Sequence, residues 1–221
     1  MIALLVVITF LAAVVIDHLI LRQPVVVKED APSLPVRPRL VAPIVAGFNV
    51  PDNLRYHPGH TWALGESPEL VRIGVDDFAA KVAGSVSRID VPKRGQWIRQ
   101  GQRIIAMQRD GMELDLVSPI EGTIVDINEK ALRDPKLAHD DPYGEGWLLT
   151  VNAPDAKTNF RNLLSGTVTR RWMDDAAAKL RAYVANPNVA TAHDGGVAVT
   201  DVFSQIPEAD RATAAKELFL N

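Results

Sequence analysis

Hydrophobic residues follow three different patterns along the chain. The first 21 residues are apolar apart from Thr9, Asp17 and His18. Between residues 56 and 153, short apolar runs alternate with turns that contain glycine or proline, which is typical of β-strands. After residue 154, apolar residues recur every three or four positions, which predicts helices. The pattern therefore divides the chain into 1–21, 22–55, 56–153 and 154–221.

The N-terminal apolar run is long enough to cross a membrane, because a spanning helix needs about 20 such residues. No Lys or Arg precedes the run and no small-residue cleavage site follows it, so a signal peptide is disfavoured. We predict that Ile2 to Leu21 is a retained transmembrane helix. Arg22, Lys28, Arg37 and Arg39 follow it. The positive-inside rule then predicts an inner-membrane protein with its N-terminus outside and its main domain in the cytoplasm.

Two ionisable residues, Asp17 and His18, lie near the end of the predicted span. At that depth their side chains can reach the headgroup region by snorkelling, which is the interpretation we favour. Contact with a helix of a partner protein is the alternative.

Residues 22–55 are predicted to form an extended tether. Six prolines lie between residues 22 and 51, and proline disfavours both helix and central strand. The apolar pieces between the prolines suggest a strap along a partner, although packing on the chain's own domain is equally compatible. The candidate partner contacts in this segment are Val25, Val26, Val27, Ile44 and Phe48.

The segment 56–153 is predicted to be a small, mainly β domain. Its clearest strands are 70–75, 103–109 and 112–117, and the last two form a hairpin around Asp110-Gly111. One short helix is expected within it, capped by Asp76 and ended by Gly84. Short strands between such turns indicate an antiparallel barrel or sandwich.

The segment 154–221 is predicted to be a helical extension that packs on the β domain or on a partner. Its longest helix is expected to place six residues near one face, with Trp172 as a further candidate partner contact. These six are Val168, Trp172, Met173, Ala176, Leu180 and Tyr183.

Composition and motifs give no support for catalysis. The 24 basic and 27 acidic residues nearly balance, so charge gives no reason to expect nucleic-acid binding, and the absence of cysteine excludes thiolate sites. His57 and His60 lack further ligands at a recognised metal spacing. His139-Asp140-Asp141 is expected to shape a loop, and the His193 to Gly196 segment a turn. We therefore expect no enzyme activity, no metal and no small-molecule substrate.

Four segments of the β domain resemble the glycine cleavage system H protein family. They are "YHPGHTW" (56–62), "IGVDDFAAKVAGSV" (73–86), "VSPIEGTIVDINE" (117–129) and "DDPYGEGWLLTV" (140–151). The resemblance implies that residues 56–153 form a lipoyl-type barrel-sandwich hybrid. The predicted transmembrane helix, the tether and the C-terminal helices lie outside the resemblance.

The family attaches lipoate to a lysine at the hairpin tip, and the resemblance places that position on Gly111. Glycine has no side chain, and the guanidinium of nearby Arg109 is a poor acyl acceptor. We therefore expect no lipoylation and no bound cofactor.

These observations favour a membrane-anchored, non-catalytic accessory or scaffolding subunit of a larger membrane complex. The expected partners are integral membrane subunits and the lipid bilayer, and the expected complex is an energy-converting one, photosynthetic or respiratory. One alternative is a carrier of a lipoate-related system that uses a non-standard attachment residue. Another is a periplasmic adaptor of the membrane-fusion type, although such adaptors usually split the lipoyl motif by a long helical hairpin.

Overall fold

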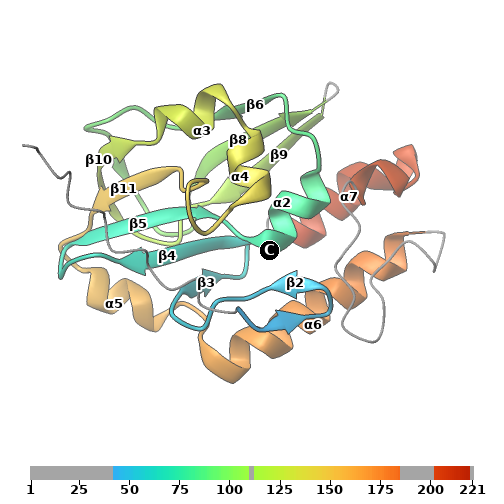
Figure 1. The fold of residues 1–221 in the computed structure, drawn as a ribbon, viewed down its shortest axis with the longest axis horizontal. Helices are drawn as coiled ribbons and strands as arrows, with labels where there is room; N and C mark the ends of the chain where they lie inside the picture. The colour runs from blue at the N-terminus through green and yellow to red at the C-terminus, as the bar shows by residue number, and fades with distance from the viewer. Residues whose placement is uncertain (1–41, 110–111, 185–201, 220–221) are drawn as a thin grey trace, which may run out of the picture. The chain divides into compact units, whose positions relative to one another are not determined.

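The computed structural model describes residues 42–109, 112–184 and 202–219 (Figure 1). The predicted membrane helix, the first part of the tether with Val25 to Val27, the Asp110-Gly111 turn and the turn at residues 193–196 lie outside the described residues. Within the described part, no helix is long and apolar enough to cross a membrane. All described residues belong to one compact unit.

Two antiparallel sheets form the centre of this unit (Figure 1). The larger sheet has the strand order β3 (Arg55–His57), β4 (Thr61–Gly65), β5 (Leu70–Val75), β11 (Leu149–Asn152), β10 (Gly122–Ile127) and β7 (Trp97–Ile98). The smaller sheet has the order β6 (Arg88–Asp90), β8 (Arg103–Arg109) and β9 (Met112–Val117). The prediction of a mainly β domain is therefore confirmed.

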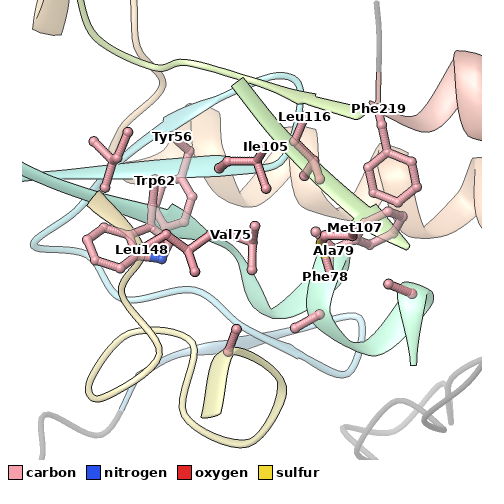
Figure 2. Close-up of a cluster of buried hydrophobic side chains, with 14 of the residues drawn as sticks. Tyr56, Trp62, Val75, Phe78, Ala79, Ile105, Met107, Leu116, Leu148 and Phe219 are labelled. Atoms are coloured by element: carbon pink, nitrogen blue, oxygen red, sulfur yellow. The ribbon is translucent and has the colours of Figure 1, made fainter. Parts of the chain in front are cut away.

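Alternate residues of both sheets point into one shared core, as period-two patterning requires. Ile73 and Val75 of the larger sheet and Ile105 and Leu116 of the smaller sheet are almost completely buried. Figure 2 shows Val75, Ile105 and Leu116 together with Trp62 in the buried hydrophobic cluster.

Helix α2 (Asp77–Ala83) follows β5 and has both of the predicted caps. The Asp76 side chain accepts a hydrogen bond from the Ala79 amide at 2.8 Å, which satisfies one of the free N–H groups of the first turn. Gly84 ends the helix with φ of 67°, a conformation that favours glycine. Two further short helices that the sequence analysis does not predict, α3 (Glu129–Arg133) and α4 (Lys136–Asp140), follow β10.

The C-terminal extension packs on its own β domain. It consists of α5 (Ala156–Arg161), α6 (Gly166–Tyr183), the 3-10 helix η2 (Phe203–Gln205) and α7 (Glu208–Phe219). Met173 and Leu180 of α6 and Leu218 of α7 are part of the common core. The expected face of α6 is wrong at Val168, which is 57% exposed; Thr169 is buried one position later.

The end of the predicted tether also packs on the domain. Residues 44–49 form a two-stranded hairpin of β1 (Ile44–Val45) and β2 (Phe48–Asn49), where no strand is expected. Ala46 and Gly47 have φ of 49° and 91°, so they make the tight turn between the strands. Phe48 is completely buried, whereas Ile44 is 50% exposed. Of these two candidate partner contacts, only Ile44 presents its side chain to the surroundings.

Candidate functional site

The hairpin of β8 and β9 is the first candidate site, because the family resemblance places the carrier residue at its tip. The strands pair directly from Ala106–Asp115 to Arg109–Met112, so two residues connect them. Arg109 Nη1 donates a hydrogen bond to the Ala83 carbonyl oxygen at 2.9 Å, which draws this side chain toward the end of α2. The hairpin thus keeps its strands while its tip residues are Asp110 and Gly111.

The side chains of this hairpin do not fit covalent lipoate attachment. No lysine occurs between residues 103 and 117, and an amide link requires an amine that can be acylated. Lys81 of α2 is 8% exposed, and its Nζ lies 2.8 Å from Asp77 Oδ2. Because the Lys81 amine is buried and paired with Asp77 on α2, not on the hairpin, Lys81 does not replace the missing residue.

The Lys81–Asp77 pair fastens the β1–β2 hairpin to α2. Lys81 Nζ donates to the Gly47 carbonyl at 3.3 Å, and the Asn49 amide donates to Asp77 Oδ2 at 2.7 Å. Burial raises the pKa of Asp77, and the hydrogen bond and charge of Lys81 oppose that shift. The pair therefore contacts both the turn and the second strand of the hairpin.

Tyr143 adds a second connection between the same elements. Its hydroxyl donates to the Asn49 carbonyl at 2.7 Å and accepts from the Asp77 amide at 2.9 Å. Burial raises the pKa of Tyr143 well above its ordinary value of 10.0, so the phenol keeps the proton that this donation needs. The "DPYGEGW" segment thereby positions the start of the domain, a role that its sequence alone does not reveal.

His60 is the centre of the second candidate site. Its Nδ1 lies 2.8 Å from Asp76 Oδ2, and both side chains are almost completely buried. The imidazole stacks on Phe78 with centroids 4.0 Å apart, and Trp172 of α6 lies against it at 4.6 Å. His60 also has φ of 61°, which is unusual for a residue other than glycine. This packing gives His60 a structural role in the core.

Phe219 of α7 completes the aromatic cluster around His60, and Figure 2 shows Phe219 beside Phe78. Its ring centroid is 5.7 Å from that of His60 and 6.2 Å from that of Phe78. A Cβ on Gly59 would lie 2.8 Å from the Phe219 carbonyl oxygen, so this close approach requires glycine. The C-terminal end of α7 is thus built into the core beside the β3–β4 turn.

An open groove runs between α6 and α7 above His60. Its lining includes apolar side chains and charged side chains of both signs. The groove is lined by Pro58, His60, Trp172, Asp175, Ala176, Ala178, Lys179, Glu217 and Leu218. Trp172, a candidate partner contact, is half-buried here against its own domain. Sequence reasoning did not identify this groove, because α6 and α7 meet only in the folded chain.

The remaining histidines of the described residues form no metal centre. His139 Nδ1 lies 2.7 Å from Asp140 Oδ1 on the surface, and His57 Nδ1 accepts a hydrogen bond from the Gly59 amide at 3.0 Å. In the part of the chain that the structure describes, no group of three or more His, Cys, Asp or Glu residues is placed to hold a metal ion. His57 and His60 point to separate partners.

His57 is expected to make the fold less stable in mild acid. Burial lowers the pKa of His57 below its ordinary value of 6.5, and the nearby His60 adds to this effect. Below pH 6.5 the unfolded chain therefore binds the proton more readily, so stability falls as the pH drops. Protonated Nδ1 also cannot accept from the Gly59 amide. The melting temperature of His57→Gln should fall less between pH 7.5 and pH 5.5 than that of the parent; an equal fall would contradict this.

Comparison with known proteins identifies the family of this chain. A family model described as "Glycine cleavage H-protein" matches residues 54–176, more than half of the 221 residues. The "Probable glycine cleavage system H protein" of Aeropyrum pernix is 34% identical over 123 residues, which cover 55% of this chain and 85% of the relative. The "Glycine cleavage system H protein" of Bifidobacterium longum is 34% identical over 108 residues, which cover 49% of this chain and 78% of the relative.

One solved structure is also similar. The crystal structure of a glycine cleavage system H protein from Mycobacterium marinum has 28% sequence identity and a TM-score of 0.44, and the match covers 47% of this chain and 86% of that chain. The family match includes the β domain, α5 and part of α6, whereas the β1–β2 hairpin and α7 lie outside it. The resemblance seen in the sequence is confirmed: the chain belongs to the glycine cleavage H-protein family.

Proposed function

We propose that this protein is a non-catalytic accessory subunit that scaffolds a larger membrane complex. Ile2 to Leu21 anchors it in the inner membrane, and its H-protein domain faces the cytoplasm and contacts other subunits. The observation that carries the proposal is the β8–β9 hairpin, which retains its strands and has Gly111 where the family's carrier lysine belongs. A carrier fold without its attachment residue keeps only its shape and its surfaces.

The added elements support a role in contacts with partners. The β1–β2 hairpin holds the end of the tether through the Lys81–Asp77 pair and Tyr143. This attachment fixes the point at which the tether enters the domain, at residue 42. A fixed entry point is useful to a subunit that must meet partners at one membrane. The exposed side chain of Ile44 next to this attachment is a candidate contact.

A carrier function is the second candidate, because the relatives named above are glycine cleavage system H proteins. Such a function would require acylation of a residue other than Gly111. Lys93, Lys130, Lys136, Lys157, Lys179 and Lys216 are exposed, and none of them lies on the β8–β9 hairpin. We therefore place this function second.

Purification of the chain from its native membranes separates the two candidates. Mild detergent extraction followed by native size analysis and intact mass spectrometry should give a multi-protein complex in which this chain has its unmodified mass. A lipoylated H protein from the same cells serves as the control for detecting the modification. A lone chain in mild detergent would refute the accessory role, and a lipoyl mass increase would establish the carrier instead.

A further inference from the structure

Exposed apolar side chains gather on the outer face of the larger sheet. The described residues include five exposed large hydrophobic side chains, and three of them lie on this sheet: Trp97 of β7 at 50%, Val125 of β10 at 37% and Leu70 of β5 at 37%. Single exposed apolar residues are ordinary, but a group on one open sheet face indicates an interaction surface. Tryptophan in particular contributes strongly when it becomes buried at an interface.

Strand register connects these residues into one line across four strands. Trp97 pairs with Thr123, Thr123 pairs with Asn152, and Asn152 pairs with Leu70. Directly paired residues of antiparallel strands have side chains on the same face. We call Trp97, Thr123, Asn152 and Leu70 the outer row. With strands about 4.8 Å apart, it is about 14 Å long.

The two ends of the outer row carry opposite charge. Beside Trp97, Arg94 is paired with Asp126, and the exposed Lys93 and Arg99 have no ion-pair partner within the described part of the chain. The exposed Glu121 precedes β10 at this end and offsets one of these two positive charges.

The Leu70 end has the opposite sign. Arg72 Nη2 lies 2.5 Å from Glu66 Oε1, which neutralises both groups. The exposed Glu69 next to Leu70 has no ion-pair partner among the described residues. The Trp97 end therefore has about one excess positive charge, and the Leu70 end about one excess negative charge.

We propose that the outer row is an interface with a second copy of this chain. A two-fold axis that lies between the facing sheets, parallel to the strands and over the middle of the row, places Trp97 of each copy on Leu70 of the other. The same operation brings the positive end against the negative end twice, as a self-complementary two-fold interface requires. Two sheets then stack about 10 Å apart with both apolar ends buried.

The charge balance favours this partner over a lipid surface. An anionic membrane attracts clusters of unpaired Lys and Arg, whereas the charges around the outer row nearly cancel. A stable interface needs about 800 Å² from each partner, more than the row alone provides. Neighbouring residues such as Val125 and Leu64, which is half-buried on the same sheet, extend the apolar area.

The first test measures the size of the full chain in detergent micelles by sedimentation velocity over a range of concentrations. The parent should form a dimer, and Trp97→Ser should raise the dissociation constant at least tenfold. Val168→Ser is the matched control, because Val168 is 57% exposed on α6, away from the outer row, and this variant should dimerise as the parent does. A monomeric parent, or a Trp97→Ser variant that dimerises normally, would overturn the proposal.

A charge-exchange experiment tests the proposed symmetry. Arg99→Glu and Glu69→Arg each place like charges together at both ends of the interface, so each variant alone should dimerise at least tenfold more weakly. When the two variants are mixed, both contacts become attractive again and a heterodimer should form. Absence of the heterodimer would refute this arrangement. Quenching of Trp97 fluorescence by brominated lipids in nanodiscs, lost in Trp97→Phe, would assign the row to a membrane surface instead.

Discussion

Phe219→Ala is expected to lower the free energy of unfolding by about 3–5 kcal/mol, the usual cost of removing a buried phenylalanine ring. Phe219 is 1% exposed, and its ring packs against the stacked Phe78 and His60 rings. The surrounding groups cannot close the space easily, because His60 is held by Asp76 and the β3–β4 turn approaches Phe219 closely at Gly59. The ring contacts are lost and a cavity remains in the core.

Urea unfolding of the full chain in detergent, followed by near-ultraviolet circular dichroism, measures this effect. Val168→Ala on the exposed face of α6 is the control and should change the free energy of unfolding by less than about 0.5 kcal/mol. A loss below about 1 kcal/mol in Phe219→Ala would mean that the end of α7 is not part of the cooperative core. Helix α7 lies outside the family match. The expected result would therefore mean that this additional helix is part of the same cooperatively folded core as the domain.

Strands with a clear hydrophobic alternation could be predicted from the sequence, because local sequence determines them. The boundaries 70–75, 103–109 and 112–117 agree with β5, β8 and β9, because apolar residues alternate there between clear turns. Helix α2 was equally predictable, since Asp76 and Gly84 are local cap signals.

The sequence did not predict elements that are held in place by residues far away in the chain. The β1–β2 hairpin has strands of two residues, too short for a periodic signal, and the partners that fix it are Asp77, Lys81 and Tyr143. His60 and Asp76 are 16 residues apart, and only the β4–β5 pairing brings them together.

Lys81→Met is expected to cost about 3–5 kcal/mol, because it leaves the buried Asp77 carboxylate without its counter-charge. The side chains of Lys81 and Asp77 are 10% and 4% exposed, so water screens the pair weakly. The variant Asp77→Asn/Lys81→Met removes both charges and keeps an oxygen that can accept from the Asn49 amide. It should recover most of the loss, since replacing a buried pair by neutral groups is often nearly neutral.

The pH dependence of the single variant distinguishes a lost charge partner from lost packing. Burial already raises the pKa of Asp77 above its ordinary value of 3.8, and removal of Lys81 raises it further. A carboxyl group whose pKa is raised by folding contributes stability when it is protonated, and that contribution is lost as the pH rises. The melting temperature of Lys81→Met should therefore be close to that of the parent at pH 5 and well below it at pH 8. The melting temperature of the double variant should differ from that of the parent by the same amount at pH 5 and at pH 8. A deficit in Lys81→Met that does not change with pH would assign the loss to other contacts of Lys81, such as that of its Nζ with the Phe48 ring.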